Sequence, residues 1–185
     1  MALTQVQGGM ILASGQSIPK AALPTGSVLQ VVQTVKTNTF SSTSATFGDI
    51  TGLTVSITPT SSSSKILVMG VLNISTSSND MIKVQIARGG SAIFIADTVA
   101  GATSALTQLY TGGSVNIPGA NWSTYPVSAF YLDSPATTSS TTYSWQIRVQ
   151  TGGNTVWVNR GADQSGSTNQ NFYGASSIIV MEIAA

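Results

Sequence analysis

The segment SSIIVMEIAA, residues 176–185, decides the fold class of this chain. It reads as an apolar β-strand, and a strand this apolar is expected to pair inside a sheet, because a free edge would promote aggregation. A second apolar strand, VLQVVQTV (28–35), follows the turn-forming residues PTGS near the other end of the sequence. These two strands, with Ser- and Thr-rich turns between them, predict a protein of short strands that closes on itself or on copies of itself.

The segments between these two strands alternate apolar and polar residues with a period of two. One face of each strand is therefore expected to be buried. Glycine pairs at Gly89-Gly90 and Gly152-Gly153 predict hairpin turns. The pattern predicts an all-β fold, an antiparallel, jelly-roll-like β-sandwich over residues 26–185. The clearest alternating segments are LTVSIT (53–58), MIKVQIAR (81–88) and TYSWQIRVQ (142–150).

One segment, KILVMGVLNI (65–74), is apolar at successive positions and therefore on both faces. Such a strand is expected to be central and covered on both sides. Charged residues make up only 7% of the chain, against about 25% in a typical soluble domain. The low charge, the doubly apolar strand and a surplus of aromatic residues together predict self-association, as a homotrimer.

The composition also bears on the chemistry of the chain. The net charge of +1 gives no electrostatic reason to bind nucleic acid or an anionic membrane, and the longest apolar runs are too short to insert into a membrane as helices. The chain contains no Cys and no His, which removes disulfides, the commonest metal ligands and the commonest general base. We therefore expect no cofactor, no metal and no enzymatic activity.

The six carboxylates are expected to have structural roles. Asp49, Asp80 and Asp133 stand beside Gly, Asn or Ser-Pro, where Asp commonly caps a turn. Glu182 lies on the less apolar face of the last strand, so we expect it to pair with Arg148 or Lys65.

Residues 1–25 are predicted to form an extended arm, because Gly and Pro residues interrupt any regular structure there. The arm lacks a basic region before its apolar stretch, so we expect no signal peptide and synthesis in a host cytoplasm. Two interpretations stay open: the arm lies across its own domain, or it attaches to a neighbouring subunit or docking site. The apolar residues that are candidates for attachment are Leu3, Val6, Met10, Ile11, Leu12, Ile18 and Leu23.

Some aromatic residues are candidates for recognition, because they lie in irregular segments or, as Trp157 between Val156 and Val158, face away from the core if those two valines face inward. Ring faces stack on the apolar faces of sugars, and neighbouring Asn and Gln side chains bond sugar hydroxyls. Trp and Tyr are also enriched at subunit interfaces, and for a trimer the interface is the favoured explanation. The candidates are Trp122, Tyr125, Trp157, Phe172 and Tyr173.

Four segments of this sequence resemble small tail-fibre and virion-surface proteins of tailed phages, especially marine ones. The resemblance covers about residues 24–185 and carries no catalytic residues. It implies a β-sandwich on a virion, usually in a trimer. The segments are GSVLQVVQTVKTNTF (26–40), ITGLTVSITPTSSSSKILVMGVLNIS (50–75), FYLDSPATTSSTTYSWQIRVQ (130–150) and SSIIVMEIAA (176–185).

The resemblance leaves the position on the virion open. A short tail fibre or receptor-binding tip would attach by its N-terminal arm and present the β-sandwich to a host surface glycan. A capsid decoration protein would instead stabilise the head lattice. In either case the expected partners are further copies of the chain and other virion proteins. A polysaccharide-degrading enzyme is the least favoured of the three interpretations.

Overall fold

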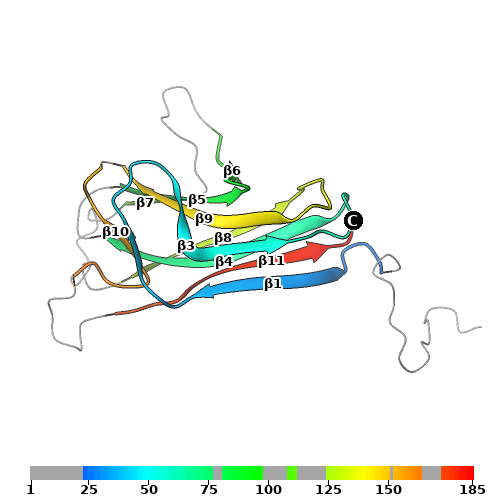
Figure 1. Cartoon of the computed structure of the whole chain (residues 1–185), viewed down its shortest axis with the longest axis horizontal. Helices are drawn as coiled ribbons and strands as arrows, with labels where there is room; N and C mark the ends of the chain where they lie inside the picture. The colour runs from blue at the N-terminus through cyan, green and yellow to red at the C-terminus, as the bar shows by residue number, and fades with distance from the viewer. Residues whose placement is uncertain (1–22, 77–80, 98–107, 112–123, 151, 164–171) are drawn as a thin grey trace, which may run out of the picture.

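The computed structural model describes residues 23–76, 81–97, 108–111, 124–150, 152–163 and 172–185 (Figure 1). These residues form eleven strands and, within the described ranges, no helix. No helix in this part of the chain is therefore long and apolar enough to cross a membrane. The strands are β1 (Val28–Lys36), β2 (Phe40–Ser42), β3 (Gly48–Ile57), β4 (Lys65–Thr76), β5 (Met81–Arg88), β6 (Ser91–Ile93), β7 (Gln108–Thr111), β8 (Tyr125–Asp133), β9 (Thr141–Val149), β10 (Val156–Val158) and β11 (Ser176–Ile183).

The strands form two antiparallel sheets. Sheet A has the order β1-β11-β4-β10-β2, with β8 on the other edge of β4. The long strand β4 pairs with β8 along one edge, and with β11 and then β10 along the other. Sheet A is therefore four strands wide, in the order β8, β4, β11, β1. Beyond the end of β11, the short strand β10 pairs with β4 in its place, and β2 pairs with β10 where β1 would lie. Sheet B has the order β3-β9-β5-β6, with β7 pairing the same edge of β5 as β6.

The strand pairings are nested along the chain. The first strand, β1, pairs with the last, β11, and β3 pairs with β9. Inside these pairs, β4 pairs with β8, and β5 pairs with β6 and β7. Rolling four nested antiparallel pairs into two facing sheets gives the jelly roll. The predicted all-β sandwich is confirmed, and the last strand lies inside a sheet, between β1 and β4, as its apolar sequence requires.

The core lies between the two sheets, and the residues predicted to face inward do so. Leu53, Val55 and Ile57 of β3 are buried, as are Ile82, Val84 and Ile86 of β5 and the alternating residues of β9. Trp145 is fully buried, and its indole N–H donates a hydrogen bond to the Ser177 carbonyl oxygen at 3.2 Å. A Cβ atom on Gly70 would lie 2.6 Å from the same carbonyl oxygen and 2.8 Å from the indole nitrogen of Trp145. The glycine therefore makes room for the indole where the two sheets meet.

Some predictions about the strands were wrong. Gly153 turns the chain with φ of 97°, but β9 and β10 do not form a hairpin, because they belong to different sheets. Gly89 and Gly90 do form the predicted hairpin turn, between β5 and β6. The strand β6 that follows this turn is short and ends at Ile93.

Strand β4 was predicted to be covered on both faces, but the structure covers only its inward face. The inward residues of β4 are buried in the core. The outward residues Leu67 and Met69 are only partly buried, and Val71 is exposed. Among the described residues, β4 is therefore covered on one face and not on both.

The sandwich has two ends with different contents (Figure 1). At the proximal end, β1 begins, β11 ends, and the chain enters from Leu23; the Gly26 N–H donates to the Ala184 carbonyl oxygen at 2.7 Å. The distal end holds β2, β10 and the segments around 159–163 and 172–175. Leu23, where the described part of the chain begins, and the distal loops thus lie at opposite ends of the strands.

Candidate functional site

An aromatic cluster forms on the distal end around Trp157. Val156 and Val158 of β10 are fully buried in the core, so Trp157 between them faces outward, as the alternation predicts. The side chain of Trp157 is partly exposed, and the Arg160 guanidinium lies 5.5 Å from the centroid of its ring. This distance is within the range of a cation–π contact.

Phe172 and Tyr173 lie beside the segment that follows Trp157, although they are far from it in the sequence, and we include them in this distal aromatic cluster. Tyr173 pairs with Arg160 in an isolated β-bridge, and the Gly161 N–H donates to the Phe172 carbonyl oxygen at 3.0 Å. Phe172 is 55% exposed and Tyr173 is 63% exposed. The distal end therefore presents two exposed rings beside a partly exposed indole and a guanidinium.

A buried amide fixes the backbone beneath the cluster. Asn159 is fully buried and has φ of 62°, a conformation that Asn tolerates better than most residues. Its amide nitrogen donates to the carbonyl oxygen of Lys36 at 2.8 Å, and its amide oxygen accepts from the Ser176 hydroxyl at 2.6 Å. The end of β1, the segment after β10 and the start of β11 are thereby tied together.

The predicted recognition residues have different outcomes. Backbone contacts with Arg160 and Gly161 place Phe172 and Tyr173 beside the segment that follows Trp157. Tyr125 lies across β4 from Val158, because both pair with Ile74. Tyr125 occupies an inward position and is partly exposed. Trp122 lies outside the described residues. Sequence reasoning missed Arg160, whose spacing of three residues from Trp157 gave no strand-like signal.

The outward face of sheet A is an apolar surface, here called the outer face. Cross-strand pairs share one face of a sheet, so the registers give three rows running across β1, β11, β4 and β8. The rows are Val31–Met181–Leu67–Leu132, Gln33–Ile179–Met69–Phe130 and Val35–Ser177–Val71–Ser128.

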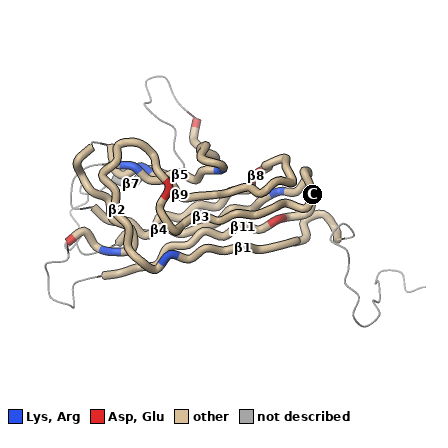
Figure 2. Tube along the Cα trace, viewed as in Figure 1, with Lys and Arg blue, Asp and Glu red and all other residues tan. Residues whose placement is uncertain are grey.

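The outer face is exposed at its edges and uncharged. Phe130 is 65% exposed and Leu132 52% on β8, while Val31 is 54% exposed and Val35 53% on β1. The strands of sheet A carry four charged residues, three of which are buried: Lys36, Asp133 and Glu182. The fourth, Lys65, marks the proximal margin, and Figure 2 shows how few charged residues the strands carry.

The outward face of sheet B has the opposite character. Gln85 donates to Gln146 at 2.6 Å, and Gln146 and Ser144 both donate to one carboxylate oxygen of Asp49, at 3.0 and 2.7 Å. Lys83 lies on the same face; burial, and then the nearby charge of Arg148, lower the pKa of its ammonium group. The polar residues thus gather on sheet B, and the apolar outward residues on sheet A.

The predicted roles of the carboxylates need correction. Asp49 does not cap a turn, because it accepts the cross-strand hydrogen bonds described above. Asp133 is buried and accepts two hydrogen bonds from the Arg88 guanidinium, at 2.9 and 2.7 Å, and one from the Tyr143 hydroxyl at 2.7 Å. Asp80 lies outside the described residues. Both corrected residues hold strands together through their side chains, which local sequence does not reveal.

Glu182 does not pair with Arg148 or Lys65. It faces inward from β11 and is fully buried. Its carboxylate accepts hydrogen bonds from the Thr60 N–H and hydroxyl, at 2.6 and 2.7 Å, and from the Gln30 amide at 2.6 Å. Burial raises the pKa of this carboxyl, but the hydrogen bonds from Thr60 and Gln30 outweigh burial and hold the pKa below its ordinary value.

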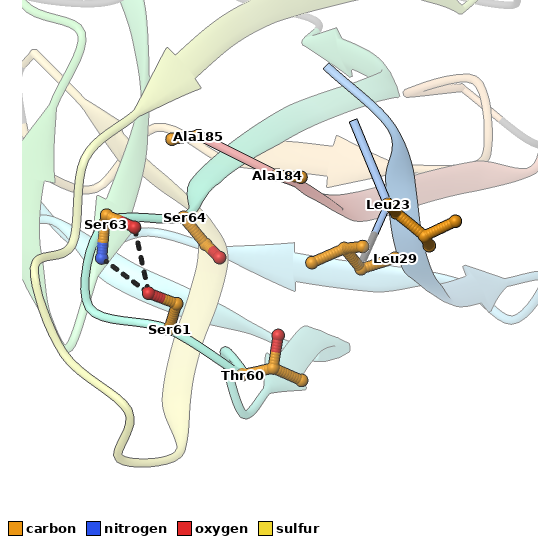
Figure 3. A pocket seen from close by; sticks show the side chains of 8 residues that line it. All are labelled: Leu23, Leu29, Thr60, Ser61, Ser63, Ser64, Ala184 and Ala185. Atoms are coloured by element: carbon orange, nitrogen blue, oxygen red, sulfur yellow. Dashed lines mark hydrogen bonds between the residues drawn. The ribbon is translucent and has the colours of Figure 1, made fainter. Parts of the chain in front are cut away.

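A hollow of about 440 Å³ lies at the proximal end (Figure 3), and its lining includes Thr60, which donates to Glu182. Leu23 and Leu29 form one side of this hollow, and the hydroxyl-bearing residues Thr60, Ser61, Ser63 and Ser64 form the other. Of the predicted attachment residues, only Leu23 belongs to the described part of the chain; Leu3, Val6, Met10, Ile11, Leu12 and Ile18 do not. Leu23 is partly exposed and lines this hollow with Leu29.

Replacing Glu182 with Gln is expected to destabilise the fold and to flatten its response to acid. The side-chain NH2 group of the new Gln must face either the Thr60 donors or the Gln30 donor, and this unpaired contact between donors costs about 1–3 kcal/mol. The folded-state pKa is lowered, so the carboxylate stabilises the protein above its ordinary pKa of 4.5, and this contribution is lost as pH falls through the folded-state pKa. Urea unfolding between pH 7 and pH 3 measures both effects. An equal loss of stability on acidification in E182Q and the parent would contradict this role.

The described residues contain no group of three or more Asp, Glu, His or Cys side chains arranged to hold a metal ion. Neither the protein-family models nor the curated proteins compared with this chain match it. The surfaces that its own geometry defines are the distal aromatic cluster and the outer face of sheet A.

Proposed function

We propose that this chain is a phage virion structural protein, a short tail fibre or receptor-binding tip. The observation that carries the proposal is the two-ended layout of the sandwich. The described chain begins at the proximal end, and β10 lies at the distal end (Figure 1). The distal end carries Trp157 of β10, the Arg160 guanidinium over its ring, and Tyr173, which pairs with Arg160. Attachment at one end leaves the other end free to meet a host surface.

The distal cluster has the chemistry of a glycan-binding surface. Exposed rings offer apolar faces to a sugar. The adjacent Arg160 guanidinium donates to the Gly161 and Ala162 carbonyl oxygens at 3.1 and 3.3 Å, and its further N–H groups are donors suited to hydroxyl or carboxylate groups. The proposed role is non-catalytic, because Asp49, Asp133 and Glu182 accept hydrogen bonds that join structural elements. The resemblance to phage virion-surface proteins agrees with this role.

A capsid decoration protein is the second candidate. It is favoured by the apolar outer face of sheet A, since a broad uncharged surface suits packing against a lattice of other subunits. The two roles differ in the contacts of the distal end. A fibre tip would bind a bacterial surface with it, whereas a decoration protein would make contacts only within the phage particle.

Cell binding tests the proposal directly. Fluorescently labelled full-length chain is mixed with host cells, and we expect saturable binding that weakens about tenfold in a Phe172→Ala/Tyr173→Ala variant, since each ring contributes about 0.5–1.5 kcal/mol. Phe94→Ala is the matched control, because Phe94 is also exposed but stacks on Tyr131 at the side of the sandwich. Binding to phage heads and not to host cells would favour the decoration role.

A further inference from the structure

We infer that a hollow beside Arg88 binds an acidic sugar of the uronic acid class, with the carboxylate of the sugar against the guanidinium. The hollow has a volume of about 340 Å³ and lies between the β5–β6 turn and the connection from β8 to β9. Ile66 pairs with both Asp133 and Glu182, so this hollow lies toward the proximal end, away from the distal aromatic cluster. The inference concerns a second site and therefore goes beyond the proposed function.

The guanidinium of Arg88 is fixed in place and only partly used. Its Nη1 group donates to both carboxylate oxygens of Asp133, at 2.9 and 2.7 Å, and this hydrogen bonding raises the pKa of Arg88. The Nε–Nη2 edge lies outside this ion pair. That edge presents two parallel N–H groups, the geometry that a carboxylate accepts from an arginine. The Arg88 side chain lines the hollow and is 34% exposed, so a ligand can reach it.

The connection between β8 and β9 is held in shape around the hollow. The Thr137 hydroxyl accepts a hydrogen bond from the Ser139 N–H at 3.0 Å, and the Thr141 hydroxyl donates to the Ser139 carbonyl oxygen at 3.1 Å. Ala136 has φ of 52°, a conformation that is uncommon for a residue with a Cβ atom. Such conformations concentrate at ligand-binding and catalytic sites. This wall of the hollow is therefore formed before a ligand binds.

The opposite wall is open, and the rim offers groups that suit a sugar. A Cβ atom built on Gly89 would meet no heavy atom within 4 Å beyond its chain neighbours. Thr137 and Ser140 bring hydroxyl groups to the rim, and Pro135 brings an apolar ring. Hydroxyl groups exchange hydrogen bonds with the hydroxyls of a sugar, and an apolar surface packs against its ring. These neighbours of Arg88 favour a sugar acid over a bare anion.

The charge around the hollow favours an anion. The two segments that enclose it, residues 89–90 and 134–140, contain no charged residue. Asp133 precedes the second segment and is paired with Arg88. The Lys65 ammonium group donates to the Ser134 hydroxyl at 2.8 Å, next to Pro135. Two cations therefore face one carboxylate at this place, which leaves a surplus of positive charge.

A titration of the full-length chain followed by NMR tests the inference. We expect glucuronate to shift the Arg88 Nε–H signal and the amide signals of Gly89 and Ser140, with a dissociation constant of about 1 mM for a ligand of this size. Glucose has a hydroxymethyl group in place of the carboxylate, and acetate lacks the sugar ring. Each of these two matched ligands should bind about tenfold more weakly than glucuronate, because each loses one set of contacts.

Variants at the rim separate binding from folding. Ser140→Asp puts a second carboxylate at an exposed position on the rim, and should weaken glucuronate binding about tenfold or more by repulsion. Thr138→Asp is the matched control, because it adds the same charge to the same connection, at an exposed residue outside the lining. Arg88→Lys keeps a positive charge opposite Asp133 but removes the two parallel donors, and should also weaken binding. Circular dichroism shows whether each variant keeps the β fold.

Several outcomes would overturn the inference. Glucose or acetate binding as tightly as glucuronate would contradict a site for a sugar acid, and so would glucuronate binding that Ser140→Asp leaves unchanged. Signal shifts confined to Phe172 and Tyr173 would also overturn it, and would support the distal cluster instead. Loss of host binding in the distal variant, with glucuronate binding retained, would leave this inference supported.

Discussion

A chain that begins at Gly26 is expected to fold and to self-associate like the full-length chain, yet to fall to background levels in phage particles. The strands begin at Val28, and the first backbone hydrogen bond that closes the sandwich at this end comes from the Gly26 N–H. The outer face begins with Val31. Removal of residues 1–25 therefore leaves every described strand of the β-sandwich complete.

The arm is expected to matter for attachment because of its apolar residues. Burial of each is worth about 1.5–3 kcal/mol, and 25 extended residues reach up to about 80 Å. Purified particles assembled with tagged full-length or truncated chain are compared by immunoblot. Met10→Ser/Ile11→Ser/Leu12→Ser should reproduce the loss, whereas Thr4→Ser/Gln5→Ser/Gln7→Ser should not.

Thermal unfolding of the truncated chain separates attachment from folding. The truncation removes Leu23 from the hollow beside Leu29, which should lower the melting temperature only slightly. A chain that aggregates, or that melts far earlier than the parent, would show that the arm belongs to the core and that the attachment hypothesis is wrong.

The sequence predicts strand faces better than strand partners. The alternation in 142–150 correctly places Trp145 and Ile147 in the core, because a period of two is a local property. The pairing of β10 with β2 and β4 is not local, so Gly152 and Gly153 suggested a hairpin that does not form. The apolar outward positions of β4 were visible in 65–74, but the sequence does not show which of its faces the fold leaves uncovered.

Polar side chains show the same limit. Asp49 and Asp133 are next to residues that favour turns, so the sequence wrongly predicted that they cap turns. Glu182 lies in an apolar strand, and the sequence wrongly predicted an ion pair for it. Their partners lie far away along the chain: Ser144 and Gln146 for Asp49, and Gln30 and Thr60 for Glu182. Only the nested pairing of strands brings these groups together, so a single sequence without the topology cannot reveal them.

Asp133→Ala is expected to be among the most destabilising single substitutions in this sandwich, at about 3 kcal/mol. Asp133 belongs to β8 in sheet A, whereas Arg88 and Tyr143 belong to β5 and β9 in sheet B, so this cluster ties the two sheets together. Burial, and then the hydrogen bond to Asp133, raise the pKa of the Tyr143 hydroxyl, which is therefore a neutral donor. Without the carboxylate, that buried hydroxyl and the Arg88 guanidinium both lose their partner.

The size of the effect follows from what is left unpaired. Removing one member of a buried ion pair costs about 3–5 kcal/mol, and the partial exposure of Arg88 places this case at the lower end. At fixed protein concentration, we expect Asp133→Ala to lower the melting temperature by about 10 °C. Tyr143→Phe, which keeps the ion pair, should cost about 1 kcal/mol.

Asp49→Ala is the matched control, because Asp49 also accepts two hydrogen bonds but is exposed, and it should cost less than Asp133→Ala. Equal losses in the two Asp→Ala variants would show that the tie between the sheets is not what stabilises this side of the fold.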